Sequence, residues 1–396
     1  MRLAGIPIEF LLFAATLIGI ALLHHRTLQV AATGLGAIVL YKLAVAGFAE
    51  GAGLAGLMSH AAGEWVILAN LFLLLTGFAL LSRHFEESRI PDEMPAILPD
   101  DWTGCFVLLA MIFVLSAFLD NIAAAIIGTT VAAKVFRHKV HIGYLAAIVA
   151  ASNAGGAGSV VGDTTTTMMW LAGVAPGEVV DAYIASAVAL VVFGIPASRV
   201  QQRHSPIMKH VEGRVAIDWA RVAIVVAILG AAVAANIATN VAYPALAAAV
   251  PVLGLTVWAV ILATMGWRAP DWTVFVPAAK GALFLLALVA SASLMPVSEL
   301  PAPSWQTALG LGFVSAVFDN IPLTALALEQ GGYDWGLLAF AVGFGGSMIW
   351  FGSSAGVAVA NLMPQARSAG LWLRHGWFVP VAYVIGFSVY ILLLGR

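Results

Sequence analysis

The sequence predicts an all-α polytopic membrane protein with two inverted repeats. Of its 396 residues, 62% are hydrophobic and only 10% are charged, and the mean hydropathy is +0.99. Apolar stretches of roughly 16 to 25 residues recur along the chain, which is the length of a membrane-spanning helix. The pair Asp-Asn occurs twice inside apolar sequence, as Asp120-Asn121 and Asp319-Asn320. Because a carboxylate is costly inside an apolar run, its repetition indicates that two halves of a membrane protein build one site.

Apolar stretches predict the membrane helices in order along the chain. They lie at about 7–23, 28–48, 65–82, 142–170, 182–198, 219–236, 243–266, 273–295, 335–362 and 376–394. Two longer segments, 102–136 and 304–330, carry Asp-Asn at their centres. The first apolar run begins behind a single arginine and is typical of a membrane helix, so we expect no cleavable signal peptide.

The charges of the loops predict the topology, because Lys and Arg in short loops mark the cytoplasmic side. The basic loops contain Arg26, Arg83, Arg89, Arg137, Lys139, Arg199, Arg203, Lys209, Arg214, Arg268, Arg367 and Arg374. They share one face if 102–136 and 304–330 make no net crossing. The opposite loops contain Glu50, Glu64, Glu178, Asp181, Glu299 and Asp334. We therefore expect both termini outside, in a prokaryotic-type inner membrane.

Three short sequence motifs recur in the same order and define the internal repeat. Leu71-Phe-Leu-Leu recurs at Leu283, Asp120-Asn121 recurs at Asp319-Asn320, and Gly155-Gly156 with Gly162 recurs at Gly345-Gly346 with Gly352. An odd number of spans separates the two Asp-Asn pairs, so the second half is inverted relative to the first. Inverted repeats with interrupted helices at matching positions are typical of secondary transporters, whose site lies near the midplane.

One motif resembles a known family. Ser152-Asn153-Ala-Gly-Gly-Ala-Gly-Ser-Val-Val-Gly162-Asp163-Thr-Thr-Thr-Thr-Met resembles the signature of NhaD-type sodium/proton antiporters. These belong to the ion transporter superfamily that also holds arsenite and dicarboxylate carriers. Asp319-Asn-Ile-Pro322-Leu and the glycine-serine segment 343–356 resemble the second-half counterparts. The resemblance implies a scaffold part and a transport part with two re-entrant hairpins and two helices broken at mid-membrane. It also implies a homodimer and an elevator-type movement. Spacing alone would equally allow each Asp-Asn to be a turn between two spanning helices.

The resemblance divides the chain into four predicted segments. Residues 1–101 hold the N-terminal scaffold helices and the start of repeat 1. Residues 102–200 hold its transport elements, a hairpin around Asp120 and the broken helix 142–170. Residues 201–303 hold a cytoplasmic loop and the scaffold helices of repeat 2. Residues 304–396 hold the hairpin around Asp319, the broken helix 335–362 and the last helix.

The predicted site combines carboxylates with neutral oxygens at the helix breaks. The predicted cation- and proton-binding residues are Asp120, Asn121, Asn153, Asp163, Thr165, Thr166, Asp319, Asn320, Ser347 and Ser353. The residues expected to ligate the metal ion are Asp120, Asn153, Asp163 and Thr166. A small hard cation such as Na⁺ or Li⁺ favours such an all-oxygen shell, to which unwound backbone carbonyls can contribute. The glycines are also explained by close helix packing, and the threonine run by packing or a helix cap.

The two half-sites are unequal, because Gly352-Ser353 stands where Gly162-Asp163 stands in the first half. A carboxylate in a low-dielectric site can hold a proton when the metal ion is absent and release it when the ion binds. Asp163 and Asp120 are expected to perform this exchange, and Asp319 to complete the site. Asp319 could instead pair with Lys280, which is explained equally as a snorkelling residue or as a coupling charge.

Other function classes fit the sequence less well than sodium/proton exchange does. The alternative is a proton- or sodium-coupled carrier of arsenite or of an organic anion such as citrate or a dicarboxylate. The negative hairpin tips would repel a carboxylated substrate. They do not exclude arsenite, which is a neutral hydroxide that protons could drive through similar groups. An intramembrane protease lacks support because Val160-Val161-Gly162-Asp163 does not match Gly-x-Gly-Asp. No phosphate-binding Gly-x-x-x-x-Gly-Lys-Ser/Thr loop occurs, which argues against ATP-driven pumping. We expect no enzyme activity, no cofactor and no nucleic-acid partner. The expected partners are membrane lipid, Na⁺ or Li⁺, H⁺ and a second copy of the chain.

Overall fold

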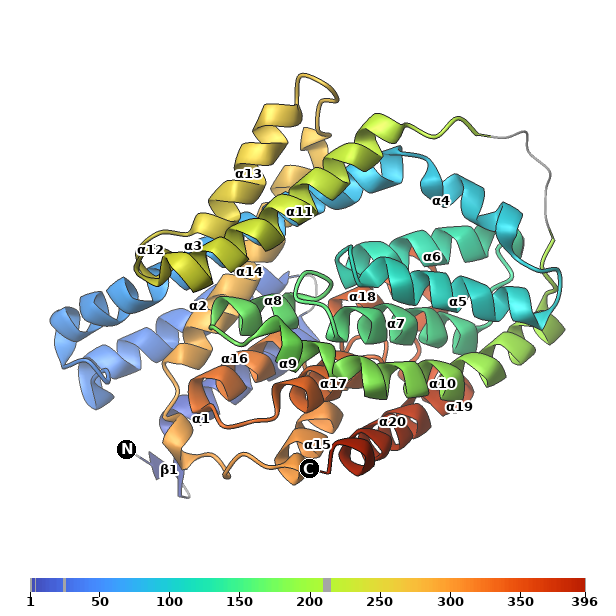
Figure 1. Ribbon diagram of the computed structural model, residues 1–396. Coiled ribbons are helices and arrows are strands. Elements are labelled where there is room, and N and C mark those ends of the chain that lie inside the picture. Colours follow the sequence, from blue (N-terminus) through green and yellow to red (C-terminus); the bar gives the residue numbers. More distant parts are fainter. Residues whose placement is uncertain (1, 4, 24–25, 209–214, 396) are drawn as a thin grey trace. The chain divides into compact units, whose positions relative to one another are not determined.

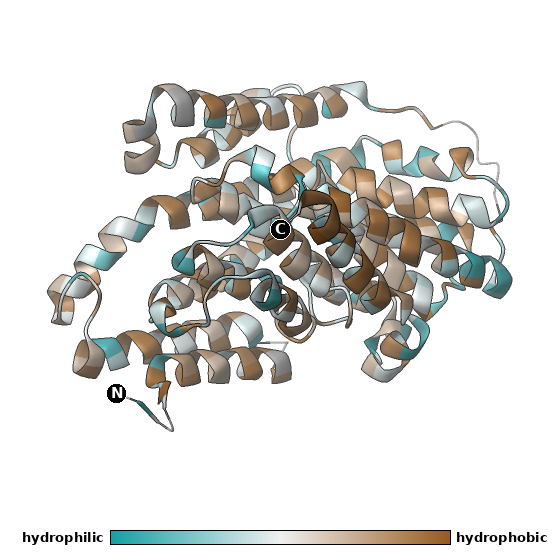
Figure 2. Cartoon of the chain, turned by 60° about the horizontal axis from the view of Figure 1, so that its bottom comes forward, coloured by the Kyte–Doolittle hydropathy of each residue, from teal (hydrophilic) through white to brown (hydrophobic). Residues whose placement is uncertain are grey.

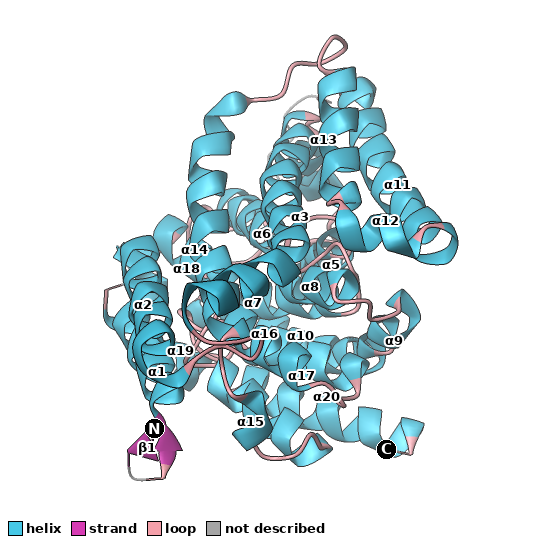
Figure 3. Cartoon of the chain, turned by 90° about the vertical axis from the view of Figure 1, so that its left-hand side faces the viewer, coloured by secondary structure: helices cyan, strands magenta, loops and turns pink. Residues whose placement is uncertain are grey.

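The computed structural model describes residues 2–3, 5–23, 26–208 and 215–395, and these are mostly helical (Figure 3). A short antiparallel pair of strands, β1 (Arg2–Leu3) and β2 (Ile6–Pro7), precedes the first helix. Apolar residues dominate the helices (Figure 2). The prediction of an all-α polytopic membrane protein is therefore confirmed. Lys209 and Arg214 of the predicted basic loop lie outside the described residues.

The chain forms two compact units. The first unit comprises Met1–Leu80, Ile224–Pro301 and Thr324–Gly331. The second unit comprises Leu81–Ala223, Ala302–Leu323 and Gly332–Arg396. Nearly all residues that the sequence predicts for the site fall in the second unit, and Lys280 falls in the first. The predicted division into four segments stays a prediction.

The first unit is built from several long helices together with shorter ones (Figure 1). They are α1 (Ile8–Leu22), α2 (Thr27–Tyr41), the π-helix η2 (Lys42–Ala46), most of α3 (Gly53–Glu87) and α11 (Trp219–Ala242), α12 (Pro244–Ala249), α13 (Val252–Thr264), η4 (Trp272–Val274), α14 (Phe275–Ser293) and η5 (Val297–Glu299). Helix α2 packs against α1 and α14. Two hydrogen bonds join α3 to α13, because Asn70 accepts from the N–H of Gly254 at 2.9 Å and Trp258 donates to the carbonyl of Leu73 at 2.9 Å.

The second unit contains shorter helices arranged around α7 (Figure 1). They are α4 (Ile90–Glu93), η3 (Met94–Ile97), α5 (Trp102–Ser116), α6 (Asn121–Val135), α7 (Ile142–Ala157), α8 (Thr164–Leu171), α9 (Pro176–Val180), α10 (Ala182–His204), α15 (Trp305–Ser315), the start of α16 (Asn320–Gln330), α17 (Trp335–Gly345), α18 (Ser354–Leu362), η6 (Pro364–Arg367), α19 (Ala369–His375) and α20 (Phe378–Leu394). Helices α5, α6, α10 and α17 all pack against α7.

Two helices form the core of the second unit. Every residue of α7 from Gly143 to Ala157 is buried, and so is every residue of α17 from Gly336 to Gly345. A helix that is apolar on all sides is stable only when other helices cover it all round. The polar side chains of these two helices are therefore buried among other helices.

Helix breaks occur inside the two segments that carry the glycine motifs. Within 142–170, α7 ends at Ala157 and α8 begins at Thr164. Within 335–362, α17 ends at Gly345 and α18 begins at Ser354. Segment 243–266 is also split, into α12 and α13, because Pro251 cannot donate the hydrogen bond that would continue the helix.

Five of the described helices are long and apolar enough to cross a membrane by length and composition, and α19 with α20 would add a sixth across a 60° bend. The five are Thr27–Ala46, Gly53–Glu87, Pro176–His204, Trp219–Thr239 and Trp272–Ser293. Helices α5, α6, α7, α13 and α17 are apolar but shorter. The segments that carry the Asp-Asn and double-glycine motifs are thus made of short helices.

Candidate functional site

Both Asp-Asn pairs lie where a helix begins. Asp120 precedes α6, and its carboxylate accepts a hydrogen bond from the N–H of Ile122 at 3.2 Å. Asp319 precedes α16, and its carboxylate accepts from the N–H of Ile321 at 3.1 Å. A carboxylate at a helix N-terminus satisfies a free N–H and faces the positive end of the helix dipole. Capping therefore fixes both carboxylates at the turns between α5 and α6 and between α15 and α16.

The helices after the two breaks are capped in the same way. Asp163 Oδ1 accepts from the N–H of Thr165 at 3.2 Å at the start of α8, and Ser353 Oγ accepts from the N–H of Gly356 at 3.2 Å at the start of α18. Ser and Asp are both good caps, but only Asp brings a formal charge. The two breaks therefore share their local geometry and differ in charge, as Gly352-Ser353 in place of Gly162-Asp163 predicts.

A buried hydrogen-bond network joins the two halves of the chain. Asn121 Nδ2 donates to Asn153 Oδ1 at 3.1 Å. Asn153 Nδ2 in turn donates to Ser347 Oγ at 2.9 Å and to Ser353 Oγ at 3.2 Å. Asn153 and Ser347 are wholly buried, and Asn121 and Ser353 are at least 95% buried. Four residues predicted for the site from separate parts of the sequence are thus brought together.

A second link between the halves runs through Asp163. Asn320 Nδ2 lies 3.4 Å from Asp163 Oδ2, and these side chains are only 4% and 2% exposed. A carboxylate this deep in an apolar interior is costly unless protonated, hydrogen-bonded or paired with a cation. The capping bond and one long bond from an amide are weak compensation. A proton or a cation bound to this carboxylate would therefore lower the cost of burying it.

Asp319 has a partner that the sequence did not single out. Ser354 Oγ donates to its Oδ2 at 3.1 Å. Ser354 follows Gly352-Ser353 and aligns with Thr164 of the first half, so the repeat offset of 190 residues was the signal that could have found it. The proposed pairing of Asp319 with Lys280 stays a prediction, because Lys280 belongs to the first unit and Asp319 to the second.

The threonine hydroxyls bridge the first break. Thr166 donates to the carbonyl of Ser159 at 2.5 Å and to that of Asp163 at 2.8 Å. Thr167 donates to Val160 and Asp163 carbonyls, both at 3.0 Å. These bonds hold the loop against α8 and support the helix-cap explanation of the threonine run. The oxygens of Thr166 and Thr167 keep lone pairs, so capping does not remove them as possible ligands.

The glycines of the breaks serve close approach rather than unusual backbone angles. No positive φ occurs at Gly155, Gly156 or Gly162. A Cβ on Gly156 would lie 2.7 Å from the carbonyl oxygen of Gly162, and one on Gly346 would lie 2.7 Å from that of Gly352. The same contact thus recurs at both breaks. Gly162 also lies in the non-helical stretch between α7 and α8, so close packing and the interruption of the helix occur together.

No group of three or more His, Cys, Asp or Glu side chains is placed to hold a metal ion within the described ranges. The three aspartates therefore do not converge on one point. A cation at this site would be bound by one or two carboxylates together with amide, hydroxyl and carbonyl oxygens, which is the donor set that a monovalent hard cation accepts.

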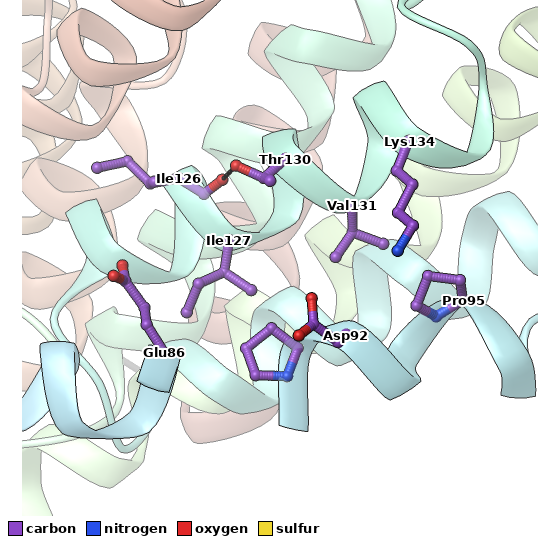
Figure 4. Close-up of a pocket in the computed structure, with 9 residues that line it drawn as sticks. Glu86, Asp92, Pro95, Ile126, Ile127, Thr130, Val131 and Lys134 are labelled. Atoms are coloured by element: carbon purple, nitrogen blue, oxygen red, sulfur yellow. Dashed lines mark hydrogen bonds between the residues drawn. The ribbon is translucent and has the colours of Figure 1, made fainter. Parts of the chain in front are cut away.

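A separate pocket of the second unit lies between the end of α3, α4, η3 and α6 (Figure 4). Its volume is about 240 Å³, and it is lined by Glu86, Pro91, Asp92, Pro95, Ile126, Ile127, Thr130, Val131 and Lys134. Glu86 and Asp92 are paired with Arg83 and Arg89 at 3.0 and 3.5 Å. None of the residues predicted for the site lines this pocket, so it is distinct from the polar cluster.

Comparison with curated proteins identifies relatives over most of the chain. A protein of Arabidopsis thaliana called sodium/proton antiporter 1 is 26% identical over 376 residues, which cover 84% of this chain and 63% of the plant protein. An Na⁺/H⁺ antiporter NhaD of Vibrio parahaemolyticus is 27% identical over 374 residues, which cover 79% of this chain and 86% of the relative. The chain is thus similar to NhaD-type sodium/proton antiporters over most of its length.

A shorter stretch is more similar to an NhaD-type protein. The Na⁺/H⁺ antiporter NhaD of Alkalimonas amylolytica is 40% identical over 78 residues, which is 19% of this chain. No family model matches the sequence. The resemblance to NhaD-type antiporters that the glycine-aspartate motif indicates is confirmed by these relatives.

Proposed function

We propose that this chain exchanges Na⁺ or Li⁺ for H⁺ across a membrane, at the buried polar cluster around Asp163. The observation that carries the proposal is a carboxylate only 2% exposed whose neighbours come from both halves of the chain. An uncompensated buried carboxylate binds either a proton or a cation. The names of the relatives in Arabidopsis thaliana and Vibrio parahaemolyticus support the same pair of ions.

The coupling follows from exclusive occupation of the same oxygens. A carboxylate must be deprotonated to ligate a metal ion, so binding of the cation releases the proton to the water that then reaches the site. In the empty site the proton returns, and the carboxyl group becomes neutral. Asp163 is the central ligand of this proposal, with Asp120, Asn153 and Thr166 as further ligands. Asp319, Asn320, Asn121, Thr165, Ser347 and Ser353 complete the cluster and hold its geometry.

We further propose that the two halves are inverted repeats whose paired short helices form re-entrant hairpins. Helices α5 and α6 have 15 residues each, and α15 and α16 have 11 each. Fifteen helical residues extend about 22 Å, less than the roughly 30 Å of a bilayer core. The recurring caps and glycine contacts support the repeat. A homodimer with an elevator-type transport part, and both termini outside an inner membrane, complete this proposal.

The test is proton movement in proteoliposomes that contain only this protein. An internal pH reporter is followed while NaCl, LiCl, KCl, citrate and arsenite are added in sequence. Na⁺ or Li⁺ should release protons from a wild-type vesicle, and Asp163→Asn should reduce the response to that of protein-free vesicles. Asn remains a good N-cap, so this variant removes the charge and keeps the capping acceptor.

A matched control is Asp101→Asn. Asp101 is an exposed N-cap of α5 and accepts from the N–H of Thr103 at 2.9 Å, so the same substitution changes an aspartate cap outside the cluster. This variant should transport as the wild type does. A response to citrate or arsenite alone, or an unchanged cation response in Asp163→Asn, would refute the proposed exchange at this site.

A further inference from the structure

One small residue of the second half borders the carboxylate of the first. Gly343 lies in the buried helix α17, and a Cβ placed on it would lie 3.3 Å from Asp163 Oδ2 and 3.6 Å from the Cβ of Ala157. A contact of 3.3 Å is tighter than most methyl groups make in proteins. A side chain at position 343 would therefore crowd this oxygen, and Gly343 keeps that side of the carboxylate free of one.

The repeat offset shows that this space is specific to the second half. Gly343 follows Asn153 by 190 residues, the offset that also relates the glycines and the caps of the two breaks. In the first half, the position is occupied by the Asn153 amide, which binds Asn121, Ser347 and Ser353. In the second half no side chain fills it, and the Asp163 carboxylate lies beside the backbone instead.

Asp163 Oδ2 retains bonding capacity beside Gly343. Its hydrogen bond from Asn320 is long, at 3.4 Å, and a carboxylate oxygen has two lone pairs. The other oxygen, Oδ1, already caps α8 through the N–H of Thr165. Of the two oxygens, Oδ2 therefore has the longer hydrogen bond, and it is the one that lies beside Gly343.

We propose that Gly343 determines the size of the cation that Asp163 accepts, a role that rests on the proposed cation exchange. A methyl group at this position would occupy part of the coordination shell around Oδ2. Li⁺ is smaller than Na⁺ and needs less space, so an added methyl group penalises Na⁺ more. One methylene in a packed pocket typically changes discrimination between ligands by about tenfold or more.

The experiment compares the Na⁺ and Li⁺ concentrations that give half-maximal proton flux in proteoliposomes. In Gly343→Ala, the value for Na⁺ should rise about tenfold and that for Li⁺ clearly less, so that the Na⁺-to-Li⁺ ratio rises severalfold. The matched control is Gly310→Ala, because Gly310 lies inside α15 and a Cβ there would have nothing within 4 Å. That variant should leave both values unchanged.

A variant on the facing helix tests the same space without adding bulk. Ala157→Gly removes the methyl group that would lie 3.6 Å from the new Cβ at position 343. The double variant should restore part of the wild-type ratio, because the two positions share one volume. Ala157→Gly alone should lower the Na⁺-to-Li⁺ ratio of half-maximal concentrations. This variant tests the role of Gly343 if Gly343→Ala does not fold.

The outcomes separate this inference from the proposed function. A wild-type protein without any Na⁺- or Li⁺-driven proton flux refutes the exchange itself. An active wild type in which Gly343→Ala changes both ions equally, or neither, refutes the role of Gly343 alone. If Gly343→Ala does not fold, an unchanged ratio in Ala157→Gly has the same meaning.

Discussion

Single hydroxyl groups stabilise the two buried helices of the second unit at corresponding places. Ser116 donates to the carbonyl of Ser152 in α7 at 2.6 Å, and Ser315 donates to that of Val342 in α17 at 2.7 Å. Both serines are wholly buried. These donors are 199 residues apart and their acceptors 190, so each helix receives the same support near its break.

We expect Ser116→Ala and Ser315→Ala to destabilise the protein by similar amounts. Each removes a donor from a buried carbonyl, which typically costs about 1 to 3 kcal/mol. Thermal unfolding of the purified protein in detergent measures the loss. Ser388→Ala is the control, because Ser388 makes the same kind of bond, to Val384 at 2.8 Å, on an exposed face of α20. A loss in only one of the buried variants would contradict the equivalence.

At the level of elements, three histidines lie together at the beginning of α7. His141 caps this helix, because its Nδ1 accepts from the N–H of Gly143 at 3.1 Å. The rings of His204 at the end of α10 and His375 at the end of α19 lie 5.3 and 5.0 Å away, centre to centre. Burial, and then the charges of His375 and His204, lower the pKa of His141 from 6.5 to about 4.

The direction of this pKa shift predicts acid sensitivity. Between pH 4 and 6.5 the unfolded chain binds a proton at His141 that the folded protein does not, so stability is complete above about pH 6.5 and falls as the pH drops towards 4. Melting temperatures across this range should therefore decline towards acid. His141→Asn keeps a capping acceptor and should flatten the decline.

The control for this pH series is His138→Asn. His138 is exposed and has a φ of 61°, a left-handed conformation that Asn tolerates well. This variant should follow the wild-type pH profile. A wild-type profile that is flat between pH 4 and 6.5, or one that His141→Asn leaves unchanged, would show that His141 does not control stability there.

At the scale of the whole molecule, the proposed cation binding should stabilise the folded protein. A ligand that binds only the native state at a hundred times its dissociation constant adds about 2.7 kcal/mol. NaCl and LiCl should therefore raise the melting temperature in detergent above that in choline chloride at equal ionic strength. Asp163→Asn should lose this difference, and Asp101→Asn should keep it. An equal rise in Asp163→Asn would locate the binding elsewhere.

The sequence predicted the class of fold and the two interrupted segments, because hydropathy and the glycine and aspartate words are local signals. It did not predict which side chains would meet. The bond from Asn153 to Ser347 joins residues 194 positions apart, and such pairs depend on how helices pack. Ser354 was missed although the repeat offset aligns it with Thr164. The glycines were correctly placed at the breaks, but their role is close approach between backbone segments rather than unusual φ angles.

The bonds of Asn153 have one more consequence for the chain. Its amide donates to two serines of the second half, and Asp163 receives its side-chain amide partner from there as well. Gly343, the counterpart of Asn153, has no side chain that could donate hydrogen bonds to the first half. If the two halves descend from one duplicated ancestor, they have since become complementary rather than redundant. The polar groups of the cluster are divided between the two halves. A substitution that removes a group from one half therefore leaves its hydrogen-bond partner in the other half unpaired.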